Sequence, residues 1–205
     1  MFNDKYGLTD AVLQGRKTMT RRIIADNDEI DAMLYARGSV EKKMEYLLGK
    51  SRYKIGEVVA VAQSYEYMAN SGYLDGMMET SSTFKKEYCG AGWNNKMFVR
   101  ADLMPHQIRI TNIKVERLQD ISEEDCLLEG VVRRKEMHPR QEWEPEYTFG
   151  DGKFHAQNPR AAFAALIDKS GVGGKGTWER NPWCVAYTFE LVGQHATKLV
   201  KSTRP

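Results

Sequence analysis

The sequence predicts an α+β fold in which a small mixed β-barrel is flanked by helices and interrupted by two or three long insertions. Apolar residues alternate over residues 183–191, which is typical of a half-buried strand. The apolar parity switches between Ile110 and Ile113, and such a flip indicates a bulge of the kind that turns the corner of a small barrel. Capping residues in front of apolar repeats with helical spacing predict the helices.

The chain should form one domain. Its 205 residues are enough for one core with embellishments, and they are few for two domains. We expect the barrel core to contain six apolar side chains, Val58, Val61, Ile110, Val115, Tyr187 and Phe189.

The composition predicts a soluble cytoplasmic protein. Thirty Lys and Arg against 28 Asp and Glu give a net charge of +2, so the overall charge does not require a nucleic-acid partner. Three widely spaced cysteines are typical of reduced thiols, and four scattered histidines lack the spacing of zinc ligands. We therefore expect no metal and no other cofactor. No run approaches the roughly 20 apolar residues of a membrane span, and the first residues lack a signal-peptide core.

The first predicted element is a helix over residues 6–14. Leu8, Ala11 and Val12 recur at helical spacing, and Gly15 can take the positive φ that ends a helix sharply.

A basic stretch, residues 15–22, follows this helix and reads Gly-Arg-Lys-Thr-Met-Thr-Arg-Arg. Its four cations repel one another unless an anion lies between them. A solvated turn before an edge strand would explain the stretch, and so would an anion or nucleotide site. Lys17 and Thr20 would point to opposite faces of a straight strand, so they converge only if the chain bends, whereas Thr18, Thr20 and Arg22 share a face.

The next segments alternate between helix and strand. Residues 26–50 are charged and read as a helical insertion, with Ser39 as a cap. Residues 58–62 form a β-branched apolar run, which predicts a buried strand. Residues 68–96 read as a loop insertion that is either a functional lid or disordered, and a second β region is expected from Met97.

A compact helix is predicted between Ser122, its cap, and Gly130, its stop. Glu129 lies in the last turn, where the helix dipole favours cations rather than carboxylates. This mismatch singles out Glu129.

The last third begins with a long polar loop, residues 131–157, whose role the sequence does not indicate. Asn158 and Pro159 then open a helix with proline at its first position. The glycine-rich turn at 173–176 lacks the strand-to-helix context of a phosphate loop, so we interpret it as a connector. The tail, residues 193–205, is polar and expected to be frayed.

Three segments resemble the ASCH domain family, which is related in fold to the PUA domains of RNA-modifying proteins. Residues 15–22 resemble its G-x-K-x-x-T-x-R signature, residues 115–130 are similar to a helix entry in its phage and bacterial members, and residues 178–183 resemble their closing motif. After Met104-Pro105, however, this chain has His106 and Gln107 where phage-type members often carry arginines.

The resemblance implies a PUA-like barrel with a cleft between the first signature and the helix containing Glu129. Small members of the family hydrolyse N4-acetylcytidine, and the Lys, Thr and Glu that they use match Lys17, Thr20 and Glu129. Other members are reported as ribonucleases or presumed to bind RNA. The resemblance therefore implies a nucleoside or RNA as the partner, and the oligomeric state stays open.

The chemistry of these three candidates leaves two roles open for Lys17. A neutral Lys17 could take the proton of an attacking Thr20 only if its pKa fell well below about 10.4, and the charges of Arg16, Arg21 and Arg22 would lower it. An ionised Glu129 would raise that pKa instead, so either Glu129 is protonated or Lys17 stabilises an oxyanion as a cation while another group acts as the base. The alternative without function is a buried Lys17–Glu129 ion pair beside Thr20.

Four further residues are candidates for binding a substrate or nucleic acid. Arg21 and Arg22 can contact phosphate, although surface charge would explain them equally well. Trp178 can stack on a base beside Asn181 of the closing motif, whereas core packing is favoured for Trp183. Two functions follow as hypotheses: an amidohydrolase of an acylated nucleoside, or a module that binds RNA or a modified base without chemistry. Ribonuclease activity is a weaker third.

Overall fold

The computed structural model describes residues 2–24, 31–32, 35–36, 39–73, 91–134, 146–150, 152 and 154–192. The fold is mixed α+β, and its main sheet is a strongly curled antiparallel half-barrel of four strands. The predicted fold class is therefore confirmed. The predicted frayed tail lies outside the described residues.

The main sheet has the strand order β1-β6-β3-β2, and a separate two-stranded sheet pairs β4 with β5. The strands are β1 (Met19–Ile23), β2 (Val58–Ala60), β3 (Gln107–Arg117), β4 (Val132–Arg133), β5 (Tyr147–Thr148) and β6 (Trp183–Val192). The α-helices are α1 (Leu8–Leu13), α3 (Val40–Leu48), α4 (Tyr65–Asn70), α6 (Glu123–Leu128), α7 (Pro159–Ser170) and α8 (Thr177–Arg180). Short 3-10 helices are η1 (Asp4–Tyr6), η2 (Ala101–Leu103) and η3 (Leu118–Asp120).

The chain divides into two compact units. The larger unit comprises Asn3–Glu57 and Arg109–Glu190, and the smaller comprises Val58–Ile108 with the two ends of the chain. The sequence predicted one domain, and we describe each unit by itself.

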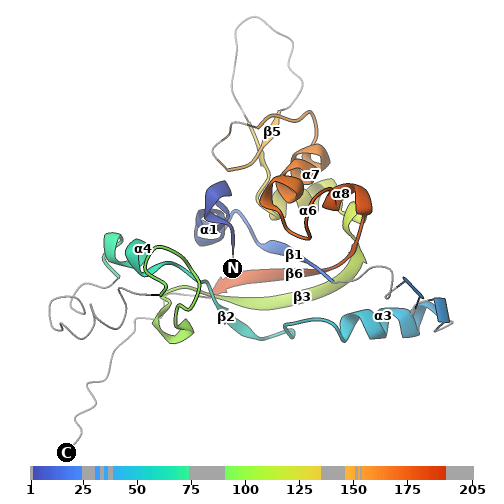
Figure 1. Ribbon diagram of the computed structural model, residues 1–205, viewed down its shortest axis with the longest axis horizontal. Coiled ribbons are helices and arrows are strands. Elements are labelled where there is room, and N and C mark those ends of the chain that lie inside the picture. The colour runs from blue at the N-terminus through green and yellow to red at the C-terminus, as the bar shows by residue number, and fades with distance from the viewer. Residues whose placement is uncertain are drawn as a thin grey trace, which may run out of the picture. The chain divides into compact units, whose positions relative to one another are not determined.

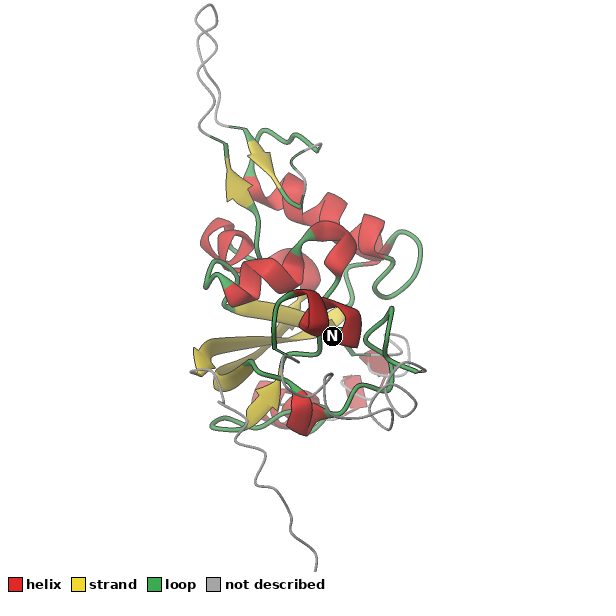
Figure 2. Ribbon diagram, turned by 90° about the vertical axis from the view of Figure 1, so that its left-hand side faces the viewer, coloured by secondary structure: helices red, strands yellow, loops and turns green. Residues whose placement is uncertain are grey.

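In the larger unit, β1, β6 and β3 run side by side and the helices α6, α7 and α8 lie over one face of these strands (Figure 1). Figure 2 shows the same arrangement from the side, with red helices above the yellow strands. One face of β1 is therefore covered by these helices. Each candidate residue of β1 points either toward the helices or away from them.

The register of β1 against β6 assigns each side chain to a face. Arg21 lies opposite Ala186, and Thr20 lies opposite Tyr187. Because directly opposed residues of an antiparallel pair share a face and neighbours alternate, Arg21 leaves one face of β1 and Thr20 leaves the other.

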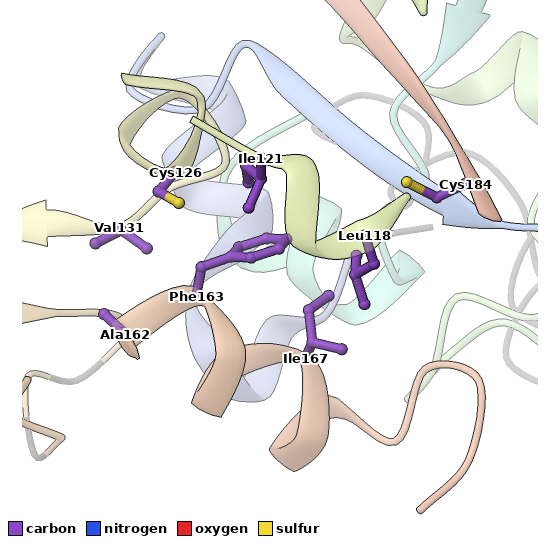
Figure 3. Packing of buried hydrophobic residues seen from close by; sticks show 8 residues of the cluster. All are labelled: Leu118, Ile121, Cys126, Val131, Ala162, Phe163, Ile167 and Cys184. Carbon is purple, nitrogen blue, oxygen red and sulfur yellow. The ribbon is translucent and has the colours of Figure 1, made fainter. Parts of the chain in front are cut away.

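The apolar core of the larger unit lies under its helices. Phe163 of α7 is 1% exposed, and its ring sits in the middle of the cluster, with Ile121 on one side and Ile167 on the other (Figure 3). The cluster members are Leu118, Ile121, Cys126, Val131, Ala162, Phe163, Ile167 and Cys184. Burial raises the pKa of the Cys126 and Cys184 thiols to about 12, so both behave as apolar side chains at neutral pH.

The predicted helix caps are confirmed. The side chains of Ser39, Ser122 and Asn158 accept hydrogen bonds from the backbone N–H groups of Lys42, Asp125 and Ala161, respectively. Each cap satisfies one of the N–H groups that the first turn of a helix leaves unpaired.

Replacing Asn158 by Ala should lower the free energy of unfolding by about 1 kcal/mol, because the first turn of α7 loses its side-chain acceptor. Urea denaturation of both proteins measures the difference. The exposed neighbour Gln157 caps no helix in the described part of the chain, so Gln157→Ala is the matched control and should stay within about 0.5 kcal/mol of the wild type.

Several expected elements differ from the observed ones. Val58 is 46% exposed and is not a core residue, because β2 is short and begins at the surface; the other five expected core residues are buried. Residues 97–99 form no strand, and Phe98 adopts a φ of 65° that breaks extended backbone. Both segments that were predicted as long loops contain regular structure. The helix α4 extends into the start of 68–96, and β4 pairs with β5 within 131–157.

The smaller unit has its own apolar cluster around α4. Tyr65, Met68, Leu103 and Met104 are buried together, and the half-buried rings of Tyr73 and Trp93 pack against them. None of the helices in the described ranges is long and apolar enough to cross a membrane.

Candidate functional site

The basic stretch runs from the end of α1 into β1, beside the end of α6. Gly15 adopts a φ of 71°, and the backbone N–H of Lys17 donates to Ala11 O at 2.9 Å. The N–H of Thr18 donates to Leu128 O at 3.0 Å. These bonds fix the start of β1 next to Glu129, which forms the C-cap of α6.

Lys17 and Glu129 form a buried pair, although 112 positions separate them in the sequence. Lys17 Nζ lies 2.5 Å from Glu129 Oε2 and donates to the backbone O of Glu129 at 2.7 Å. Lys17 is 2% exposed and Glu129 is 4% exposed. The ammonium therefore also neutralises a carbonyl at the negative end of α6, which explains how a carboxylate is tolerated there.

The pKa of Lys17 lies below its ordinary value of 10.5. Burial is the main cause, because an ammonium loses its hydration in the interior. Glu129 opposes this effect by attraction, and the charges of Arg22 and Arg21 reinforce it by repulsion. Lys17 consequently holds its proton less firmly than an exposed lysine does.

Arg21 occupies the centre of a larger ionic network. Its guanidinium contacts three carboxylates: Nη2 lies 2.6 Å from both Glu116 Oε1 and Asp125 Oδ2, and Nη1 lies 3.2 Å from Glu129 Oε1. Nε donates to Glu116 Oε1 at 2.8 Å, and Arg21 as a whole is 4% exposed. The half-exposed Lys114 extends the network, with its Nζ 2.5 Å from Glu116 Oε2.

This network ties three elements together. Arg21 belongs to β1, Glu116 to β3, and Asp125 to α6. Glu129 has its two carboxylate oxygens divided between Arg21 and Lys17. Arg21 therefore keeps a full positive charge beside Glu129 whether or not Lys17 carries its proton. The buried position of Arg21 differs from the phosphate contact and from the surface charge that the sequence suggested.

Thr20 and Arg22 leave the other face of β1. Both are half-buried, and Thr20 lies opposite the buried Tyr187. Within the described part of the chain, the Thr20 hydroxyl has no hydrogen-bond partner. The positive charge of Arg22 lowers the pKa of Lys17 by repulsion, although Arg22 leaves the other face of the strand.

The closing motif serves to build the fold. The ring of Trp178 meets that of Phe163 edge to face at 6.2 Å, and its backbone O accepts from Gln119 Nε2. Asn181 ends α8 with a φ of 44°, and its Oδ1 accepts from the backbone N–H of Gln119. These two candidates for substrate binding are therefore tied to η3 and α7.

Trp183 is half-buried at the start of β6 and stacks under a cation. The guanidinium carbon of Arg117 lies 4.4 Å from its ring centroid, and Asp31 Oδ1 accepts from both Trp183 Nε1 and Arg117. This cation–π contact stabilises a half-buried ring that the alternating pattern had predicted as core.

Sequence reasoning missed Glu116 and Asp125 as partners of the basic stretch. Glu116 is 6% exposed, and a buried acid next to the buried Val115 breaks the period-two pattern of β3. Two adjacent buried residues in a strand mark Glu116 as unusual. This mark is visible only in the folded structure, because the sequence does not show which side chains are buried. The described residues contain no group of three His, Cys, Asp or Glu side chains placed to hold a metal ion.

No protein-family model, no curated protein and no solved structure matches this chain.

Proposed function

We propose that this protein is an amidohydrolase that removes the acyl group from an N4-acylated cytidine, with Lys17, Thr20 and Glu129 as its reacting set. The observation that carries the proposal is the buried Lys17–Glu129 pair, whose carboxylate is shared with Arg21. A lysine in such a place can give up and regain a proton while its carboxylate partner stays neutralised. The resemblance of residues 15–22 and 115–130 to ASCH amidohydrolases supplies the substrate class.

The proposed reaction is an acyl transfer through Thr20. Lys17 removes the proton of Thr20 Oγ1 as the oxygen attacks the acyl carbonyl carbon, and a C–O bond forms. Collapse of the tetrahedral intermediate breaks the C–N4 bond, and Lys17 returns the proton to the leaving amine. Water then hydrolyses the acyl-threonine to release the acid.

This reaction requires two rearrangements of the folded ground state. Lys17 Nζ donates to Glu129 and must release Glu129 Oε2 when substrate binds. Thr20 leaves the face of β1 opposite to that of Arg21 and Glu129, so the strand must also bend to turn the Thr20 hydroxyl toward Lys17. Arg21 supports the release of Lys17, because Glu129 keeps an ionic partner throughout. The half-buried Thr20 hydroxyl has no described partner to give up.

The wild-type protein should release acetate from N4-acetylcytidine, and Thr20→Val should reduce the rate at least a hundredfold, because valine keeps the shape of threonine without the attacking oxygen. Chromatographic separation of N4-acetylcytidine from cytidine measures both rates. Thr18 lies two residues earlier with the same parity and is also half-buried, so Thr18→Val is the matched control and should retain activity.

The rate should rise with pH, because the reaction needs Lys17 as a free amine. The midpoint should fall below 10.5, the ordinary lysine value, since burial lowers the pKa of this group. A wild-type protein that forms no cytidine at any pH from 6 to 10 would remove the amidohydrolase proposal for this substrate.

A second candidate is a module that binds RNA or a modified base without chemistry. The two short bonds from Lys17 Nζ to Glu129 favour it, because they are also what a permanent structural ion pair would show. Such a module would bind N4-acetylcytidine without turnover and would keep its affinity in Thr20→Val. Equilibrium binding of wild type and variant, measured beside the rates, separates the two candidates.

A further inference from the structure

The smaller unit buries polar atoms that lack partners. Gln63 is 1% exposed, and within the described residues neither its amide oxygen nor its amide nitrogen has a hydrogen-bond partner. His106 is 6% exposed, and its Nδ1 is unpartnered in the same sense. Proteins rarely leave such groups unpaired in the interior, because a buried polar group without a partner destabilises the fold.

The two residues lie on neighbouring segments. The N–H of Val61 donates to His106 O at 2.9 Å, and the N–H of Gln63 points to Met104 Sδ at 3.3 Å. Residues 61–63 therefore run beside residues 104–106, and the side chains of Gln63 and His106 are buried in the same region of the unit.

His106 is held in place by Tyr73. The Nε2 atom of His106 lies 2.9 Å from the Tyr73 hydroxyl, and the two rings meet at 85° with centroids 5.3 Å apart. Burial lowers the pKa of His106, so its ring is neutral at neutral pH. The tautomer then depends on the Tyr73 hydroxyl, and Nδ1 can serve as a donor or as an acceptor.

The apolar cluster of this unit contacts both residues. Met104, which meets the Gln63 N–H, belongs to it, and Tyr73, which meets His106, packs against it together with the half-buried ring of Trp93. An uncharged planar molecule can lie against such rings, whereas an ion would lose its hydration without meeting an opposite charge on Gln63 or His106.

We propose that Gln63 and His106 form a binding site for a neutral planar lactam, a ring in which an N–H group stands next to a carbonyl. The amide of Gln63 donates to the lactam carbonyl and accepts from the lactam N–H, which are the two bonds of an amide pair. His106 Nδ1 contacts a further polar atom of the ligand, and the ligand ring lies against the Tyr73 ring that holds His106. This site goes beyond the proposed hydrolysis, because it needs neither Lys17 nor Thr20.

The test uses two pairs of probes with the full-length protein. 2-Pyridone and uracil have the lactam edge, whereas N-methyl-2-pyridone and 1,3-dimethyluracil keep the ring and carbonyls but lack the N–H. We expect the lactams to bind at least tenfold more tightly than their methylated partners, and to shift the side-chain amide resonances of Gln63 in a ¹H–¹⁵N spectrum. Equal binding within each pair, no binding at all, or an unmoved Gln63 amide would overturn the proposal.

Variants locate the site independently of the spectra. Gln63→Met keeps the length of the side chain without its hydrogen bonds and should weaken 2-pyridone at least tenfold. Thr148 of the larger unit carries another buried hydroxyl with no partner among the described residues, so Thr148→Val is the matched control and should bind as the wild type does. Unchanged affinity in Gln63→Met refutes the assignment. Thr20→Val should bind 2-pyridone normally, so a failure of the hydrolysis proposal leaves this result untouched.

Discussion

Replacing Arg21 by Met should lower the free energy of unfolding by about 3 to 5 kcal/mol, which is the expected cost of removing one partner from a buried ionic group. Methionine fills part of the space, but Glu116 and Glu129 keep their negative charges in the interior with only lysines to pair them. Urea denaturation at pH 7, with the slope checked against that of the wild type, measures the loss.

The neighbouring arginine provides the control. Arg22 is half-buried on the other face of β1, so Arg22→Met should cost less than half as much as Arg21→Met. Similar losses in both variants would show that the three carboxylates do not depend on Arg21, and would remove the central role assigned to it.

Replacing Lys17 by Met should abolish turnover of N4-acetylcytidine, with a fall in kcat of at least a thousandfold, because Lys17 is the group that carries the proton between Thr20 and the leaving amine in the proposed reaction. Glu129→Gln should also reduce kcat strongly. Residues that act as one unit are not additive, so the variant with Lys17, Thr20 and Glu129 all replaced should be scarcely slower than the slowest single one. Steady-state kinetics on all of these variants measures the pattern.

Stability against pH separates this catalytic role from a purely structural pair. The pKa of Lys17 is lower in the folded protein than in the unfolded chain, so the unfolded chain binds more protons between the two values. The free energy of unfolding of the wild type should therefore gain a contribution from Lys17 as the pH rises through that window toward 10.5, and Lys17→Met should lack it. A structural pair that holds its proton would give the opposite slope, with stability lost at high pH.

The local pattern of the chain was enough to predict several elements. Ser39, Ser122 and Asn158 each stand directly before an apolar repeat, and capping depends only on the next three residues. The long strand β6 was readable for the same reason, because alternation is a property of adjacent positions. The pairing of β4 with β5 was missed, since two-residue strands carry no period that a sequence can display.

The candidate site, too, could be predicted only in part from the sequence. The sequence by itself determined that residues 15–22 hold an excess of positive charge that needs an anion, and that Glu129 is misplaced for its own helix. Only the tertiary structure decided that Glu129 is the anion that pairs with this positive charge, because it folds α6 beside β1 and places Glu129 against Lys17. It also decided which arginine is enclosed, because the register with β6 turns Arg21 toward the helices and Thr20 away from them. Charge and capping act over a few residues, whereas burial depends on segments about a hundred residues apart, and burial is what lowers the pKa of Lys17.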